Sequence, residues 1–193
     1  MRLRILSLIA TISMLPAVTT AANLSYQNVD FAIFLSSEID AGNADVDGDG
    51  FQLRGTLPIA NNFFAFAEFQ VLNYDFDVDV TRFAVGGGGH WPLSSTVDII
   101  ARLGVSNIQV DVPGGDDDDT GLFVGGRIRA LITPQFELEG GVEFYQVEAG
   151  AIDDETALVG EARYHFNSQW SAGVLVSIGS DTSNFGIHGR FSF

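Results

Sequence analysis

The basic residues of this chain are all arginines: nine Arg and no Lys stand against 25 acidic residues. Most of these arginines recur at alternate positions of segments that also carry carboxylates. The planar guanidinium binds a carboxylate through two parallel hydrogen bonds, which suits fixed ion pairs in poorly hydrated space. We therefore predict a network of paired charges, whose members are Asp30, Arg54, Glu68, Arg102, Arg127, Arg129, Glu143, Glu161, Arg163 and Arg190.

A run of aspartates is the candidate metal site. Asp45-Val-Asp47-Gly-Asp49-Gly50 has oxygen donors at alternating positions, like the opening of an EF-hand calcium loop. The twelfth position of that motif is Thr56 rather than Glu, so the full motif fails. Asp-Gly pairs are also common in hairpin turns. Weak Ca²⁺ or Mg²⁺ binding by Asp45, Asp47 and Asp49 and ordinary turn formation both stay open, and no other cofactor is expected.

The three histidines do not suggest a catalytic group. A hydrolase or transferase site would need a His beside Ser, Asp or Glu at the mouth of the fold. His90 and His165 lie close to turn signals, and His188 falls among alternating charged positions near the end of the chain. We assign His188 to the polar network and expect no enzymatic activity.

Strands must position these side chains, because alternation with period two recurs and no helical period stands out. Ten strands are expected, at 26–38, 50–58, 63–74, 80–90, 96–110, 121–132, 136–148, 157–166, 170–180 and 185–193. Short uncharged connections alternate with longer acidic ones at 39–49, 75–79, 111–120, 149–156 and 181–184. That asymmetry is typical of an all-β, up-and-down antiparallel barrel with short periplasmic turns and acidic extracellular loops. Eight strands are the alternative, because the segment 75–79 is short.

Each expected strand has one apolar face without charge and one face that carries the charged residues. A soluble lipocalin-like barrel would bury the apolar face, whereas a transmembrane barrel would bury the charged one. The absence of Lys favours the transmembrane barrel. So does the near-balance of seven Arg and about eight carboxylates on the charged face, which Glu38 is expected to join near the outer rim. Aromatic residues also gather near the short turns, as in an interfacial girdle: Tyr26, Phe63, Trp91, Phe136, Phe166, Trp170 and Phe193.

The N-terminal segment predicts export. Two arginines precede an apolar run, which is followed by Pro and small residues. This is the pattern of a secretory signal peptide, here residues 1–22, cleaved after Ala21 or Ala22. The apolar run is too short for a membrane anchor helix. The remaining residues, 23–193, then form one barrel domain, which contains no cysteine although export would permit disulfides.

The expected last strand ends on an aromatic residue. Phe185, Ile187, Phe191 and Phe193 share one face of that strand, with charge on the other. Here the chain resembles small Gram-negative outer-membrane β-barrels of the OmpA/OmpX-like kind, as it does at Asp47-Gly-Asp-Gly-Phe51. The resemblance implies a location in the cell outer membrane, a final strand read by the barrel-assembly machinery, and outer-membrane lipid and lipopolysaccharide as partners. We expect a monomer, no nucleic-acid partner and no periplasmic domain after Phe193.

The acidic loops shape the expected function. Acidic residues that are not on the charged face lie in or beside the longer loops, so most of the net charge of −16 forms a cap at the outer rim. Such a cap repels nucleic acid and attracts cations, which it would share with the phosphates of lipopolysaccharide. We expect a porin-like outer-membrane barrel with a charge-paired, largely plugged lumen and a structural or surface-interaction role. A narrow cation-favouring diffusion channel is the alternative, and an outer-membrane enzyme is the third.

Overall fold

The computed structural model describes residues 24–40, 45–146, 154–180 and 182–193. The expected signal peptide and its cleavage sites lie outside the described residues, so that division of the chain stays a prediction. No helix in the described ranges is long and apolar enough to cross a membrane. The strands are β1 (Asn28–Asp40), β2 (Asp45–Ala60), β3 (Phe63–Tyr74), β4 (Val78–Ser94), β5 (Val97–Val112), β6 (Gly115–Thr133), β7 (Phe136–Tyr145), β8 (Glu155–His165), β9 (Trp170–Ile178) and β10 (Thr182–Ser192).

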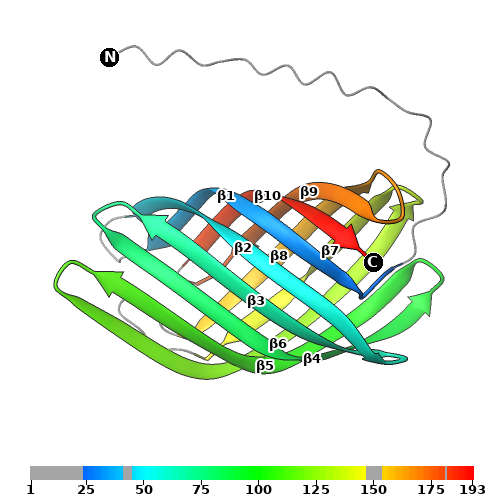
Figure 1. Ribbon diagram of the computed structural model, residues 1–193, viewed down its shortest axis with the longest axis horizontal. Helices are drawn as coiled ribbons and strands as arrows, with labels where there is room; N and C mark the ends of the chain where they lie inside the picture. Colours follow the sequence, from blue (N-terminus) through cyan, green and yellow to red (C-terminus); the bar gives the residue numbers. More distant parts are fainter. Residues whose placement is uncertain (1–23, 41–44, 147–153, 181) are drawn as a thin grey trace, which may run out of the picture.

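The ten strands close into a barrel (Figure 1). Strands that follow one another along the chain pair antiparallel, and β1 also pairs with β10, so every strand has a partner on both sides. The register of this seam runs from Asn28↔Ser192 to Ile39↔Thr182. Closure removes the free sheet edges and gives the backbone polar groups hydrogen-bond partners within the sheet. The predicted all-β, up-and-down barrel is confirmed, with ten strands rather than eight.

Two acidic runs that the sequence places in loops lie in strands instead. β2 begins at Asp45, and the run up to Gly48 pairs with β1. β6 begins at Gly115, and Asp116 pairs with Asp111 of β5. Asp and Gly have low strand propensity, so their composition signals turns. Pairing with the neighbouring strand outweighs that local preference and carries the carboxylates beyond the apolar part of the wall.

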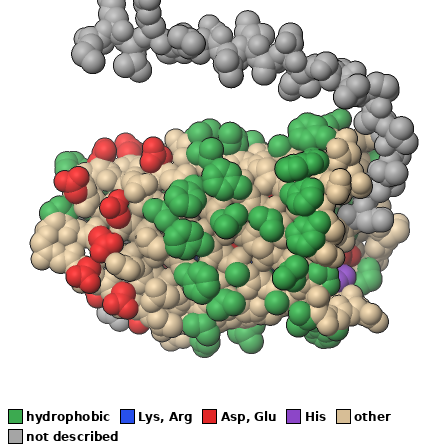
Figure 2. Space-filling view, in the orientation of Figure 1, with side chains coloured by type: hydrophobic (Ala, Val, Ile, Leu, Met, Phe, Trp, Pro, Cys, Tyr) green, Lys and Arg blue, Asp and Glu red, His purple; other side chains and the backbone are tan. Residues whose placement is uncertain are grey.

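Large apolar side chains cover the outside of the barrel, and charged side chains fill the inside. Phe31, Leu103 and Leu158 are 50%, 59% and 61% exposed on the outer face, whereas Arg163 is 1% exposed inside. Figure 2 shows apolar side chains over the side of the barrel and acidic side chains gathered at the end that carries the longer loops. A soluble protein has the opposite arrangement, so the lipocalin-like alternative does not hold.

A β-bulge in β1 changes one predicted position. The pairing of β1 with both neighbours shifts just after Phe34, and the next inward residue is Ser37. Strict alternation predicts that Glu38 joins the charged lumen. In the structure Glu38 is exposed instead, so this prediction is wrong. Glu155, at the start of β8, is 1% exposed and takes part in the lumen instead. One extra residue in a strand reverses the facing of every residue beyond it, and composition does not reveal where the insertion falls.

Apolar side chains lie inside the barrel at both ends of the charged region, which the alternation pattern did not predict. Near the loop ends of their strands, the buried inward residues are Leu72, Tyr74, Val80, Ile108 and Val110. Near the short turns they include Phe64 and Ile100. Tyr26 also lies inside, 8% exposed, and so does not belong to the outer aromatic girdle. The other expected members of the girdle are 37% to 54% exposed.

Candidate functional site in the barrel lumen

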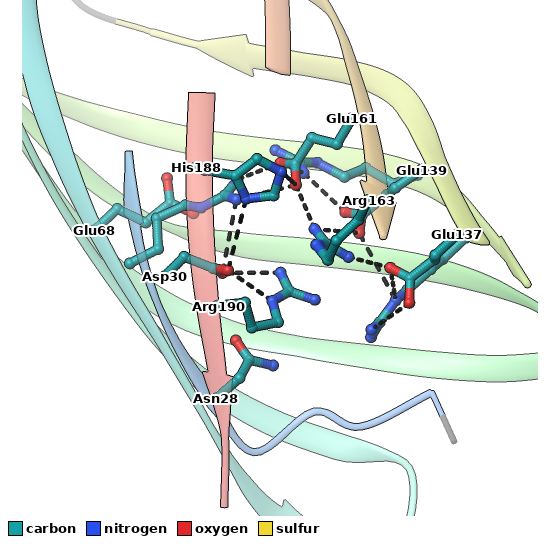
Figure 3. A network of polar contacts seen from close by, with 12 residues as sticks. Asn28, Asp30, Glu68, Glu137, Glu139, Glu161, Arg163, His188 and Arg190 are labelled. Carbon is teal, nitrogen blue, oxygen red and sulfur yellow. Dashed lines mark hydrogen bonds and ion pairs between the residues drawn. The ribbon is translucent and has the colours of Figure 1, made fainter. Parts of the chain in front are cut away.

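The seam of the barrel carries a two-bond ion pair. Asp30 of β1 and Arg190 of β10 are register partners, so both side chains point into the lumen at the same level. The Nε of Arg190 donates to Oδ1 of Asp30 at 2.6 Å, and Nη2 donates to Oδ2 at 2.8 Å. Arg54, the register partner of Asp30 on β2, has its Nη2 3.6 Å from Oδ2. Asp30 thus lies between two arginines where the first and last strands meet. Figure 3 shows its pairing with Arg190.

Glu161 of β8 connects opposite walls of the lumen. It accepts two hydrogen bonds from Arg54, from Nη1 at 2.5 Å and Nη2 at 3.1 Å. Nη2 of Arg163 donates to it at 2.5 Å, and Nη1 of Arg127 at 3.3 Å. Because β2 and β8 are four strands apart in the ring, the bonds to Arg54 cross the interior rather than run along the wall.

A second group of charges surrounds Arg127 of β6. Its guanidinium donates to Glu143 at 2.7 and 3.0 Å and to Glu139 at 2.8 Å. The same oxygen of Glu143 accepts from Nη1 of Arg102 at 2.9 Å, and Arg102 also pairs with Glu68. The guanidinium carbon of Arg102 lies 4.1 Å from the centroid of the Phe66 ring, in cation–π contact.

Further pairs lie toward the two ends of the lumen. Near the short turns, Arg129 donates to both oxygens of Glu137 at 2.8 and 3.0 Å, and Arg163 also contacts Glu137. Near the loops, Nη2 of Arg82 donates to Glu155 at 2.8 Å. The Arg82–Glu155 pair was absent from the predicted site. The sequence does contain a signal for Glu155: it is separated from Glu161 and Arg163 by even numbers of residues, so all three lie on the same face of β8.

The structure brings all ten predicted network residues into one contacting group inside the barrel. Seven arginines face eight carboxylates there, so the interior is close to neutral: Arg54, Arg82, Arg102, Arg127, Arg129, Arg163 and Arg190 with Asp30, Glu68, Asp98, Glu137, Glu139, Glu143, Glu155 and Glu161. Most of these groups are hydrogen-bonded to one another, although Nε of Arg82 and Nε of Arg163 are buried without a partner among the described residues.

Two small cavities lie within this network. The first, toward the short turns, has a volume of about 50 Å³ and is lined by Tyr26, Asn28 and Thr56 among others. The second, toward the loops, also has a volume of about 50 Å³ and is lined by Gln52, Gln70 and Asn184 among others. Arg54, Glu68 and Arg127 line both cavities. Each cavity is large enough to hold ordered water, since one water molecule needs about 10–15 Å³ of such space.

His188 is buried inside the network, where the sequence places it. Its Nδ1 lies 3.9 Å from Asp30, and its Nε2 lies 4.0 Å from Glu161. His90 and His165 lie near the short turns, close to Asp98 and Glu137 respectively. Among the described residues, all three histidines are therefore remote from the acidic loop end.

The candidate metal residues lie at the loop end of β2. Asp47 and Asp49 are exposed, and the side chain of Asp45 falls outside the described part of the structure. Alternate residues of a strand are about 7 Å apart, so the carboxylates of Asp47 and Asp49 do not converge as ligands do in a calcium loop. Within the described ranges, no group of three His, Asp or Glu side chains is placed to hold a metal ion. Cation binding at Asp45, Asp47 and Asp49 stays a prediction.

The apolar residues of the last strand face outward. Phe185, Ile187 and Phe193 are 46%, 46% and 51% exposed. Phe191 packs between Trp170 and Phe193, with ring centroids 4.7 and 6.0 Å away. Recognition of these residues as an assembly signal stays a prediction.

No protein-family model and no curated protein matches the chain, but solved structures do. The translocator domain of the autotransporter NalP from Neisseria meningitidis is similar with a TM-score of 0.50 and 8% identity, covering 89% of this chain and 90% of that chain. Neisserial surface protein A gives 0.48 and 13%, covering 88% and 98%. Ail of Yersinia pestis gives 0.43 and 15%, covering 86% and 100%. The NalP comparison shows the fold, the closed β-barrel found in outer-membrane proteins.

Proposed function

We propose that this protein is an integral outer-membrane β-barrel with a closed, charge-paired lumen, and that its role is structural or surface-interactive. One observation carries the proposal: apolar side chains cover the outside of the barrel, while seven arginines and eight carboxylates fill its inside. In water, an apolar wall of this extent would be unfavourable, at about 25 cal/mol for each Å² left exposed. A surrounding bilayer removes that penalty.

Strand lengths and exposed aromatics support membrane insertion. The shortest strands, β7 and β9, contain 10 and 9 residues. A tilted strand needs about 9–11 residues to cross the hydrocarbon core. Trp91 and Trp170, half-exposed near the short turns, are suited to the periplasmic interface. The longer β2 and β6 then carry their aspartates past the opposite interface, toward the cell exterior.

The predicted export signal and the outward face of β10 support delivery to the outer membrane by the barrel-assembly machinery. Lipid and lipopolysaccharide are the neighbours that follow from this location, and the acidic rim disfavours nucleic acid. We propose a monomer. A catalytic role lacks support, because the described histidines lie away from the acidic rim that faces the exterior.

A narrow cation-favouring channel is the second candidate. It is favoured by one observation: both cavities are lined by the same layer of charged residues, Arg54, Glu68 and Arg127. An acidic rim would raise the local concentration of cations at the entrance of such a path. A small movement of this layer would join the cavities.

Planar-bilayer conductance separates the two candidates. We expect the unaltered protein to give no steady open-channel steps, and Arg127→Ala or Glu143→Ala to introduce them by opening the charged layer. Glu38→Ala, which removes an exposed carboxylate, is the matched control and should stay closed. Steady, cation-selective steps in the unaltered protein would instead establish the diffusion channel.

Divalent cations are proposed to bind the acidic rim, at Asp45, Asp47 and Asp49, and to bridge it to lipopolysaccharide phosphates. Carboxylates are good ligands for Ca²⁺ and Mg²⁺. A calcium titration of the folded barrel, followed by the amide signals of residues 45–50, tests this. Unchanged signals at millimolar calcium would rule out binding at this run.

A further inference from the structure

A short segment before the first strand lies inside the short-turn mouth of the barrel. Residues 24–27 belong to no strand, yet Tyr26 is 8% exposed. The hydroxyl of Tyr26 donates to Oδ2 of Asp98 on β5 at 2.8 Å. Its ring stacks on His90 of β4, with centroids 3.9 Å apart, and on Phe64 of β3 at 5.3 Å. Burial raises the pKa of the Tyr26 phenol, so the hydroxyl remains a donor.

A second contact ties the same segment to the far wall. Nη1 of Arg129 on β6 donates to the backbone oxygen of Ser25 at 2.9 Å, and its guanidinium lies 5.2 Å from the Tyr26 ring centroid. In a ring of ten strands, β6 is five positions from β1 in either direction. The contacts of Ser25 and Tyr26 therefore reach the wall opposite β1, through the long side chain of Arg129. Figure 3 shows the backbone before β1 running below Asn28.

The cavity behind this segment contains unsatisfied polar groups. Oδ1 of Asn28 and Oγ1 of Thr56 are buried without a hydrogen-bond partner among the described residues. Asn28 and Thr56 are register partners on β1 and β2, and both line the first cavity together with Tyr26. A buried polar group without a partner costs about 1–3 kcal/mol, so the site is suited to ordered water.

We propose that residues 24–27 form a latch that closes the periplasmic mouth of the lumen, with Tyr26 as its stopper, and that water enters the first cavity only when the latch opens. The inference rests on the proposed closed barrel and extends it. The charged network blocks the middle of the lumen, and the latch separately controls access from the short-turn end. Opening the latch alone leaves the layer of Arg54, Glu68 and Arg127 in place.

Thiol labelling tests the latch without background, because the chain has no cysteine. A reporter Thr56→Cys places a thiol in the first cavity, and Gln52→Cys, on the same face of β2, places one in the second. Full-length protein isolated from membranes is treated with a small cationic methanethiosulfonate. We expect Thr56→Cys to react at least tenfold faster when combined with Tyr26→Ala, and Gln52→Cys to be unaffected. Tyr26→Phe, which keeps the ring, should retain slow labelling.

Several outcomes would overturn the latch. One is a labelling rate of Thr56→Cys that is the same with Tyr26 as with Tyr26→Ala. Another is a rate at Gln52→Cys that Tyr26→Ala raises as much as the rate at Thr56→Cys, which would indicate a loosened barrel. If Tyr26→Ala does not fold, His90→Ala removes the stacking surface and should still accelerate labelling at Thr56→Cys; an unchanged rate there would also contradict the latch. Fast labelling of Thr56→Cys with Tyr26 intact rejects the latch yet leaves the closed lumen standing, since conductance tests the charged network independently.

Discussion

Glu143 shows how much of the lumen depends on one side chain. One of its oxygens accepts hydrogen bonds from Arg102 at 2.9 Å and from Arg127 at 2.7 Å, while Tyr145 donates to the other at 3.0 Å. All of these groups are buried. A buried ion pair often adds little net stability, because desolvation offsets attraction. Removing one member is different, since it leaves the remaining buried charges with fewer compensating partners.

We therefore predict that Glu143→Ala lowers the free energy of unfolding by about 3 kcal/mol, at the low end of the usual range, because two guanidiniums lose their shared partner while Arg102 keeps Glu68 and Arg127 keeps Glu139. Urea titration of the folded barrel, followed by tryptophan fluorescence, measures the change. Glu38→Ala is the control, because the bulge in β1 leaves Glu38 exposed, and its stability should stay unchanged. Equal losses in the two variants would contradict the structural difference between them.

At the scale of the strands, alternation in the sequence was enough to find ten strands and the inward position of nearly every charged residue. It failed where local composition and pairing disagree. Asp45 and Asp116 lie in strands because they pair with residues of the adjacent strands β1 and β5, although Asp and Gly are typical of turns. It failed again beyond the bulge after Phe34, where the facing of Glu38 depends on an irregularity that no single strand reveals. The buried position of Tyr26 depends on contacts with four strands that are distant in the sequence, so the pattern of residues around it does not predict that it lies inside the barrel.

In the last strand, β10, and the residue that follows it, we expect different side chains to affect assembly and stability. Deleting Phe193 removes an outward aromatic from the predicted assembly signal, so we predict a several-fold fall in folded protein in the membrane. Arg190→Ala keeps the outward face and should assemble normally. It should lose about 3 kcal/mol of stability, at the low end of the usual range, because Arg54 stays near Asp30.

Heat-modifiable migration in unboiled gels measures the assembled fraction, and urea titration measures stability. Phe136→Ala, which removes an exposed aromatic at the same end of the barrel, is the control for the deletion and should assemble normally. If deleting Phe193 leaves the assembled fraction unchanged, the last residue is not part of the signal.

The whole molecule separates its charge into two regions. The interior is nearly neutral, so the net charge of −16 concentrates at the loop end, where Asp116, Asp117 and Asp118 are exposed. Figure 2 shows acidic side chains gathered there. Carboxylates crowded at one rim repel one another in the folded state, whereas the paired interior charges are held in contact. Salt screens exposed charges much more than buried pairs.

We therefore predict that the barrel becomes more stable as salt rises from about 0.01 to 0.15 M, over which the screening length falls from about 30 to 8 Å. Replacing the four residues from Asp116 to Asp119 by Asn should raise stability at the lower salt concentration and remove much of the increase, because fewer like charges then face one another. Urea titrations of both proteins at the two salt concentrations measure this. A salt response that is equally large in the substituted protein would place its origin in the other exposed carboxylates of the rim, such as Asp47 and Asp49, because screening the attractive Arg–carboxylate pairs of the interior would lower stability rather than raise it.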